Sequence, residues 1–411
     1  MIRIRIAGFL ARASTLAYGE TQAIAQAQIE PLPQPAPALT LTLLMPDSDQ
    51  AATPSSDANA PVPHRRRPRY AGKNPRRFED KYKELNPERY AEDVAKVIAS
   101  GKTPAGSHRP IMVAEILEVL ALQPGELAVD CTLGYGGHAR ELLERVAPEK
   151  GKIRGRLIGL DVDPIEHPKT TARLRAAGWD ENVFTSVRSN FAGLAKVLAQ
   201  HAPDGADAIL ADLGVSSMQL DDPARGFTFK TDSPLDLRLN PSRPPSAADW
   251  LARVSTADLA AALTENSDEP NAVIIAEGLT ARRASTPFTH TLLLAETIRE
   301  ILQQHNRSRD QEKDDTCIRR VFQALRIAVN DEFGVLDQLL RQLPTCLKSG
   351  GRVAILTFHS GEDRRVKHAF REGVRSGIYT STNDEVVKAG FEEQRANPRS
   401  TSAKLRWALR A

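Results

Sequence analysis

A glycine-dense turn between an apolar segment and a helix-forming segment is the feature that most constrains the fold of this chain. Residues 127–130 read Leu-Ala-Val-Asp, residues 131–138 read Cys-Thr-Leu-Gly-Tyr-Gly-Gly-His, and residues 139–144 have the composition of a helix. Glycines allow positive φ and a close approach to a ligand, and a helix start offers unpaired N–H groups. The order predicts a strand, a ligand-binding turn and a helix, but turns of this kind also close strands for purely local reasons.

A second strand pattern that ends in acids strengthens the ligand-binding interpretation. Residues 156–163 read Arg-Leu-Ile-Gly-Leu-Asp-Val-Asp, and Asp161 follows Asp130 by 161 − 130 = 31 residues. This spacing suits a β-α-β unit whose second strand ends in a ribose-binding acid.

Strand and helix patterns continue to alternate after this unit. A third strand pattern covers residues 183–187, and a fourth covers residues 207–214 and contains Asp212. The alternation predicts an α/β fold with a doubly wound parallel sheet, and ligands of such sheets bind at the carboxyl ends of the strands. We therefore expect Asp130, Asp161 and Asp212 to lie at one edge of the sheet.

The pattern changes at about residue 222. Turn-rich sequence leads to several helical segments without strands over residues 246–304, which we interpret as a helical insertion. The α/β pattern resumes with a helix that starts at residues 321–330 and continues toward Leu343. A strand over residues 351–358 follows, and His359 and Ser360 come directly after it.

Composition excludes several classes of protein. The 411 residues are 41% hydrophobic and 26% charged, as is ordinary for a globular protein, and the net charge of +3 means that any nucleic-acid contact must come from local patches. The three cysteines have no metal-ligand spacing and form no disulfide framework. The chain has no run of about 18 apolar residues, so we expect no transmembrane helix.

The first 105 residues form an extension that we predict to be largely disordered and then basic. Residues 1–60 are too poor in packing residues to offset the entropy of ordering. Their start is interpreted either as an organellar transit peptide or as a nonfunctional extension. The basic stretch at residues 64–83, with interleaved Tyr70, Phe78 and Tyr82, is either an RNA clamp or a solvated arm.

The motifs together resemble the family of S-adenosylmethionine-dependent methyltransferases that modify N4 of a cytidine in the decoding region of small-subunit ribosomal RNA. The resemblance spans roughly residues 106–410, and its order and spacing make it highly specific. The matching segments are residues 108–111, 130–138, 212–223, 225–229, 234–238, 322–330, 358–364, 397–399 and 402–406.

The resemblance implies a Rossmann-like methyltransferase domain with a helical insertion domain. We expect the first part of the methyltransferase domain at residues 106–221, the loop and helical insertion at 222–318, and the second part with a basic tail at 319–411. It also implies S-adenosyl-L-methionine as the cofactor, small ribosomal subunit RNA as the partner, no metal, no membrane, and a cytoplasmic location, or an organelle in a eukaryotic source. A homodimer is one option for the oligomeric state.

The resemblance also implies roles for individual residues. The residues that would hold the cofactor are Gly134, Gly136, Gly137, His138, Asp161, Phe191, Asp212 and Gln219. Cytosine N4 is a poor nucleophile, so the site needs acceptors for the amine hydrogens, and the candidates are Asp212, Ser216, Ser217 and His359. The candidates for RNA phosphates are Arg225, Arg238, Arg326, Arg364, Arg399 and Lys404.

The chain departs from the family pattern at three places. Gly361 stands where the family usually has Leu, residues 313–320 lack the usual lead-in, and the N-terminal extension is unusually long. Two alternatives therefore stay open: a methyltransferase of the same fold that acts on another substrate, and a cofactor-binding ribosome assembly factor without activity. A nicotinamide-dependent dehydrogenase is disfavoured, because the glycine loop does not follow Gly-x-Gly-x-x-Gly.

Overall fold

The computed structural model describes residues 110–148, 155–305, 307 and 310–411. All of them belong to one compact unit, Arg69–Ala411. The predictions for residues 1–105, including the basic stretch at 64–83, lie outside the described residues.

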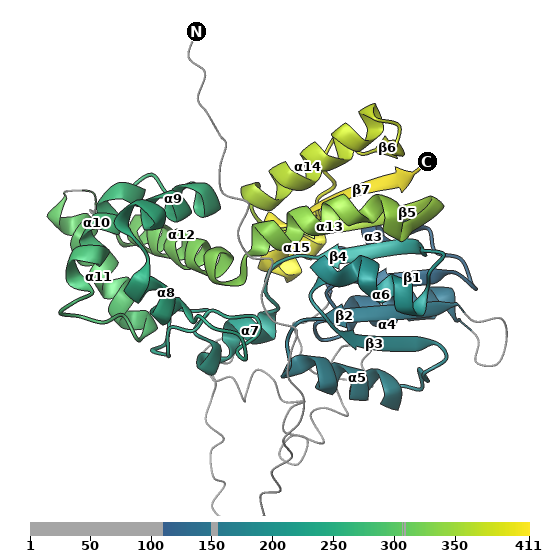
Figure 1. The fold of residues 1–411 in the computed structure, drawn as a ribbon, viewed down its shortest axis with the longest axis horizontal. Helices are drawn as coiled ribbons and strands as arrows, with labels where there is room; N and C mark the ends of the chain where they lie inside the picture. Colours follow the sequence, from purple (N-terminus) through teal and green to yellow (C-terminus); the bar gives the residue numbers. More distant parts are fainter. Residues whose placement is uncertain (1–109, 149–154, 306, 308–309) are drawn as a thin grey trace, which may run out of the picture. The chain divides into compact units, whose positions relative to one another are not determined.

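A seven-stranded sheet confirms the predicted α/β fold (Figure 1). The strand order is β3-β2-β1-β4-β5-β7-β6, in which neighbours from β3 through β5 are parallel and β7 runs antiparallel to β5 and β6. The antiparallel edge was not predicted, because β7 lies in the segment that we interpreted as a basic tail. The strands are β1 (Leu127–Asp130), β2 (Arg156–Asp161), β3 (Phe184–Arg188), β4 (Ala206–Asp212), β5 (Leu347–Thr357), β6 (Tyr379–Thr382) and β7 (Lys404–Arg410).

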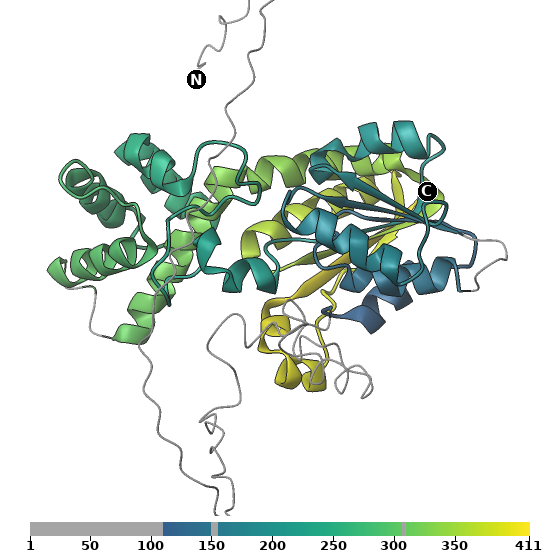
Figure 2. The ribbon, with the colours of Figure 1, turned by 90° about the horizontal axis from the view of Figure 1, so that it is seen from below.

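Helices cover both faces of this sheet, as Figure 2 shows with the strands seen nearly edge-on. Successive side chains of β4 point to opposite faces of the sheet: Ile209 belongs to the hydrophobic core on one face, and Ala208 and Leu210 belong to the core on the other face. One face carries α6 (Leu194–His201), α13 (Glu332–Cys346) and α14 (Ser360–Arg375), and the other carries α3 (Val113–Leu120), α4 (Gly137–Val146) and α5 (Glu166–Ala176).

Five helices between β4 and β5 form a separate hydrophobic core, which confirms the helical insertion (Figure 1). The preceding loop adds Phe227, Leu235 and Leu237 to this core. The predicted boundary after residue 318 falls inside the last of these helices, whose residues Val321 and Leu325 pack in the insertion core. The helices are α8 (Ala247–Arg253), α9 (Thr256–Ser267), α10 (Ala272–Arg282), α11 (Thr291–Gln304) and α12 (Gln311–Asn330).

The expected single helix toward Leu343 is wrong, because it is divided at Asp331. This residue has φ of 49° and ends α12, and α13 begins at the next position. Just before the break, the Asn330 amide donates to the Leu237 carbonyl (2.7 Å), and its oxygen accepts from the Leu239 N–H (2.7 Å). Asn330 thereby ties the loop that enters the insertion to the helix that leaves it.

Short helical turns complete the chain. They are α7 (Ser217–Asp221), α15 (Phe391–Ala396), and the 3₁₀ turns η2 (Phe191–Gly193), η3 (Pro223–Arg225) and η4 (Pro398–Ser402). In the described part of the chain, no helix combines the length and apolar character needed to cross a membrane.

Candidate functional site

Acidic side chains gather where the parallel strands end. Asp130, Asp161 and Asp212 are the last residues of β1, β2 and β4, as the sequence predicted, and Glu362 comes from the first turn of α14, just after β5. The carboxyl ends of parallel strands form the edge at which α/β proteins bind ligands.

Asp130 and Thr132 join the ends of β1 and β4. The Thr132 N–H donates to Asp130 Oδ1 (3.0 Å), and the Thr132 hydroxyl accepts the Asp212 N–H (2.7 Å). Burial raises the pKa of Asp130 to about 6. The backbone around Asp212 is thus held from the neighbouring strand.

Asp161 accepts two backbone hydrogen bonds from different loops. Gly134 N–H donates to Oδ2 (2.6 Å), and Asp163 N–H donates to Oδ1 (2.8 Å). Burial raises the pKa of Asp161, and these hydrogen bonds oppose that effect. Each carboxylate oxygen keeps a further acceptor position, which ribose hydroxyls could use.

A cavity at this edge brings three of the predicted cofactor residues together. Asp161, Phe191 and Gln219 line it. The rest of its wall combines apolar and polar residues from the strand ends, the loops that follow them, and helices α12, α13 and α14: Cys131, Thr132, Val162, Ser189, Asn190, Leu213, Gly214, Leu239, Asn330, Glu332, Val335, Leu336 and Glu362.

This lining fits the nucleoside part of S-adenosyl-L-methionine. A carboxylate at the end of the second strand suits a ribose, and Phe191 with Leu213 and Val162 offers apolar surface for a base. The chemistry of these side chains therefore agrees with the expected cofactor.

The glycine loop has the predicted strand, turn and helix form. Gly134 and Gly136 have φ of 47° and 83°, and α4 begins at Gly137. A Cβ on Gly136 would lie 2.9 Å from the Thr170 methyl carbon, so the turn requires glycine there. The described lining of the cavity includes neither the predicted glycines nor His138 and Asp212, so the contact of these residues with the cofactor stays a prediction.

The His138 side chain is turned toward Asp212. Its Nε2 lies 2.9 Å from the Ile111 carbonyl oxygen and its Nδ1 lies 3.5 Å from Asp212 Oδ2. Because a carbonyl can only accept, Nε2 carries a proton, and burial lowers the pKa of the ring. In neutral His138 the Nδ1 lone pair therefore faces the Asp212 carboxylate.

Asp212 is the least satisfied acid of this edge. Its Oδ1 is buried and has no hydrogen-bond partner among the described residues. Burial, and then the charge of Glu362, raise its pKa to about 7. Such an atom is suited to accept a hydrogen bond from a ligand that enters the site.

Glu362 is better satisfied than Asp212. It accepts the Phe358 N–H (2.8 Å), and His359 Nε2 lies 3.2 Å from its Oε1. Burial opposes ionisation, but these contacts outweigh it and hold the pKa of Glu362 below its usual value. His359, predicted as catalytic, is thus the partner of a buried acid, and its role in the reaction stays a prediction.

The loop after β4 is fixed by a capping box and by Asp163. Ser216 Oγ accepts the Gln219 N–H (3.2 Å), and Gln219 Oε1 accepts the Ser216 N–H (2.9 Å). The Gln219 amide also donates to Asp163 Oδ2 (2.8 Å). Ser216 and Gln219 therefore shape the loop, whereas the Ser217 side chain lies outside what the structure describes.

The expectation that Arg225 contacts RNA is wrong. Its side chain is 6% exposed, its Nη1 lies 2.8 Å from Asp163 Oδ2, and its Nη2 donates to the carbonyls of Arg238 and Leu239. A buried guanidinium with these partners has no surface for a phosphate.

The other predicted RNA contacts are more accessible and stay predictions. Arg364 is the most exposed of them, at 59% of its side chain. Each forms an ion pair within the chain: Arg238 with Asp236, Arg326 with Glu332, Arg364 with Asp268, Arg399 with Asp221, and Lys404 with Asp363.

Two acids of the site were missed from the sequence as functional residues. Glu362 carried a detectable signal, since it follows His359 by three residues at a helix start. Asp163 carried none, because its partner Arg225 lies 62 residues away.

Replacing Arg225 tests the buried ion pair with Asp163. Arg225→Met leaves Asp163 buried without its cation, so we expect the free energy of unfolding to fall by about 3–5 kcal/mol. Arg399→Met, which removes a partly exposed pair with Asp221, should cost about 0–1 kcal/mol. Urea denaturation measures both, and equal losses would contradict the assignment.

Residues 105–411 match the sequence profile of the MraW methylase family. The chain is 46% identical over 349 residues to ribosomal RNA small subunit methyltransferase H 1 of Lachnoclostridium phytofermentans, which covers 85% of this chain and 93% of that protein. It is also 46% identical to the protein of the same name from Agathobacter rectalis, over 85% of this chain and 98% of that one.

Solved structures are similar at low sequence identity. An rRNA methylase from Streptococcus thermophilus matches with a TM-score of 0.33 and 10% identity, over 72% of this chain and 93% of that one. Fibrillarin from Aeropyrum pernix, solved with S-adenosyl-L-methionine, matches with a TM-score of 0.31 and 11% identity, over 72% and 73% of the two chains.

Proposed function

This chain belongs to the MraW methylase family and is a methyltransferase that uses S-adenosyl-L-methionine, and on that premise we propose that its substrate is small-subunit ribosomal RNA. We propose further that the methyl acceptor is the exocyclic N4 amine of a cytidine in the decoding region. The names of the curated relatives support the RNA substrate. The observation that carries the proposal for the amine is the buried oxygen of Asp212, which has no hydrogen-bond partner within the described part of the chain.

The cofactor would occupy the cavity at the carboxyl edge. Asp161 would accept hydrogen bonds from the ribose hydroxyls, and Phe191 would pack against the adenine. When bound, the cofactor supplies an electrophilic methyl group on a positively charged sulfur.

Asp212 would prepare the amine for attack. The nitrogen lone pair of cytosine N4 is delocalised into the ring, and an acceptor for the amine hydrogens favours its localisation. Asp212 Oδ1 offers this acceptor without first breaking a protein hydrogen bond among the described residues. Its position at the end of β4, fixed by Thr132, would orient the amine.

His138 and Glu362 would tune this acid from two sides. The charge of Glu362 raises the pKa of Asp212, and the neutral His138 ring presents its Nδ1 lone pair to Asp212 Oδ2. Both would favour a carboxylate that readily holds a proton released by the amine. Ser216, Ser217 and His359 remain candidates for further contacts with the base, which must leave its stack to enter the site.

Asp161→Asn tests the ribose contact. Loss of the charge weakens hydrogen bonds to the hydroxyls, so we expect the Kd for S-adenosyl-L-methionine to rise by about 10- to 100-fold in calorimetry. Asp207→Asn, at the opposite end of β4, is the matched control and should leave the Kd unchanged. Equal Kd values for both variants would contradict the role of Asp161.

Asp212→Asn tests the proposed reaction. Labelled S-adenosyl-L-methionine and small ribosomal subunits that lack the modification should yield N4-methylcytidine with the wild type. The variant should lose about 10²-fold or more of the rate while it still binds the cofactor, because an amide presents an uncharged acceptor.

Other outcomes of this assay identify the alternatives. Label in another nucleoside would indicate a methyltransferase of the same fold that acts on a different substrate. Cofactor binding without any methyl transfer would indicate an assembly factor that does not catalyse. Either result would overturn the proposed function.

The pH dependence tests the ionisation of Asp212. The acceptor must be ionised, and its pKa is raised to about 7, so the rate should rise with pH through about 7 and then level off. Glu362→Gln removes a charge that raises this pKa, so the midpoint should move to lower pH. A profile that is flat from pH 5 to 8, or a midpoint that moves upward, would contradict this account.

A further inference from the structure

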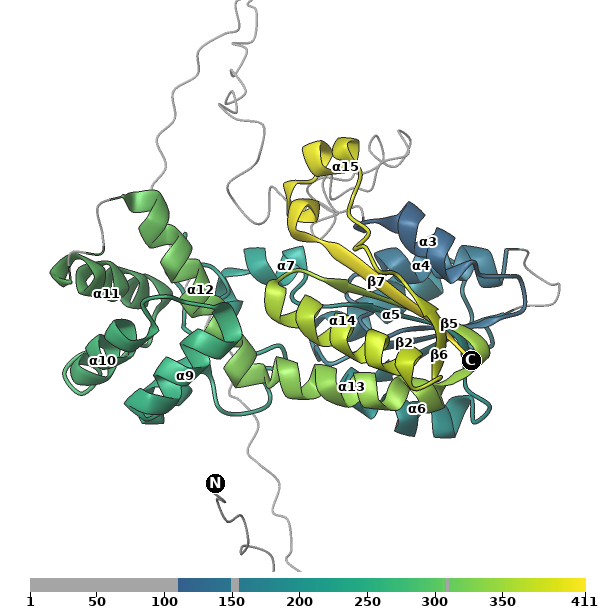
Figure 3. The same ribbon diagram turned by 90° about the horizontal axis from the view of Figure 1, so that it is seen from above.

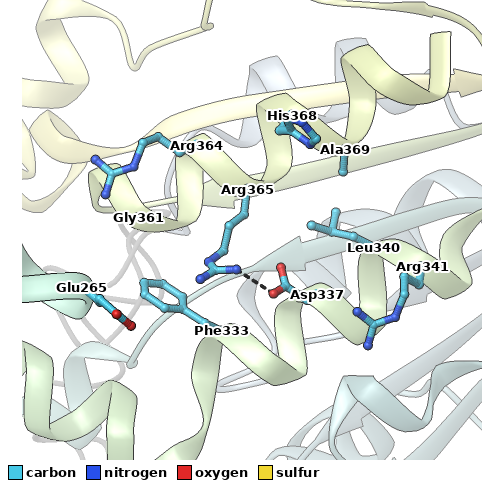
Figure 4. A pocket seen from close by; sticks show the side chains of 10 residues that line it. All are labelled: Glu265, Phe333, Asp337, Leu340, Arg341, Gly361, Arg364, Arg365, His368 and Ala369. Atoms are coloured by element: carbon cyan, nitrogen blue, oxygen red, sulfur yellow. Dashed lines mark hydrogen bonds and ion pairs between the residues drawn. The ribbon is translucent and has the colours of Figure 1, made fainter. Parts of the chain in front are cut away.

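A groove between α13 and α14 lies on the outer side of these helices (Figure 4). The two helices pack side by side, as Figure 3 shows from above. The groove has a volume of about 500 Å³, within the range of sites that hold small ligands. It is separate from the cofactor cavity, which none of its lining residues enters.

Three arginines and two acids line this α13–α14 groove. Arg341, Arg364 and Arg365 line it together with His368, against the two acids Glu265 and Asp337. The arginines come from both helices: the Arg365 side chain lies between them, and Arg364 and Arg341 stand at opposite ends of the groove (Figure 4).

The existing ion pairs leave these cations able to bind a phosphate. Arg364 pairs with Asp268 at 3.3 Å, but both side chains are more than half exposed. Arg365 lies 2.6 Å from Asp337. Arg341 is exposed and forms no ion pair with the described residues. Exposed pairs contribute only about 0–1 kcal/mol, and each guanidinium has five donors for planar anions.

The floor of the groove is apolar and aromatic. Leu340 and Ala369 line it, and the Arg365 guanidinium lies over the Phe333 ring, 4.3 Å from its centroid. A Cβ on Gly361 would lie 2.6 Å from Phe333 Cζ, so the missing side chain at position 361 admits this ring. An aromatic ring together with arginines in one groove is a combination that single-stranded nucleic-acid sites use.

The groove adjoins the catalytic edge through α13 and His359. Phe333 faces the groove, whereas its neighbours Glu332 and Val335 line the cofactor cavity. The His359 ring lies 5.7 Å from the Phe333 ring and 3.2 Å from Glu362. Residues 332–335 of α13 thus contribute both to the groove and to the cofactor cavity.

We propose that the α13–α14 groove binds single-stranded RNA that flanks the target base, with one phosphate on Arg341 and another on Arg364. This inference rests on the proposed function. An acidic protein segment could satisfy the charges of the arginines, but it would make no use of the Phe333 ring in the groove.

Charge reversal in the full chain tests this assignment. The double variant Arg341→Glu/Arg364→Glu changes the groove, and Arg371→Glu/Arg375→Glu makes the same charge change on α14 away from it. A short fluorescent single-stranded RNA is the probe, with anisotropy measured over a range of salt concentrations. Calorimetry with S-adenosyl-L-methionine reports whether each variant keeps the folded cofactor site.

We expect the groove variant to weaken RNA binding by about 10-fold or more and to reduce the slope of log K against log salt by about 1.4, for two lost phosphate contacts. The control variant should bind RNA more tightly than the groove variant, and the affinity for the cofactor should be the same in both.

Three outcomes would overturn the assignment. Equal RNA affinities and salt slopes for the two variants, with methyl transfer by the wild type intact, would reject the groove and keep the proposed function. Wild-type protein that neither binds RNA nor methylates subunits would reject both. Loss of binding to an acidic ribosomal protein, with RNA affinity unchanged, would assign the groove to a protein partner.

Discussion

The burial of acids at the carboxyl edge of the sheet is the constraint on which this site depends. A buried carboxylate is costly unless donors surround it. Asp161 meets this need with two backbone N–H groups, Glu362 with a backbone N–H and His359, and Asp163 with Arg225. Asp212 Oδ1 has no such donor within the described chain. Among these acids, the unsatisfied oxygen therefore belongs to the one that we assign to the acceptor amine.

The ion pair of Asp163 and Arg225 couples this edge to the helical insertion. Asp163 follows β2, whereas Arg225 lies in the turn that leads toward the insertion and bonds to the carbonyl of Leu239. Gln219 joins the same carboxylate, so the loop after Asp212 is held from β2. Asn330 fixes the other end of the connection. Together these contacts connect both ends of the insertion to the residues around the site.

Much of the fold could be predicted because it depends on patterns within short segments of the sequence. The glycine turn and the acids at the ends of β1, β2 and β4 follow from periodicity and spacing within short segments. The partner of Arg225 could not be predicted, because a lone arginine beside a turn has the same local signal whether it is buried or exposed. Strand β7 was missed for a similar reason: Lys404 and Arg406 resemble a basic tail, but they pair with Asp363.

The carboxyl-carbon NMR signal of Asp212, titrated in the full chain, tests the central claim most directly. Its assignment comes from the spectrum of Asp212→Asn, in which the signal is absent. We expect a midpoint near pH 7, because burial and the charge of Glu362 both oppose ionisation. A midpoint close to 3.8, the value of an exposed aspartate, would show that Asp212 is solvated or already paired, and would contradict its role as the waiting acceptor.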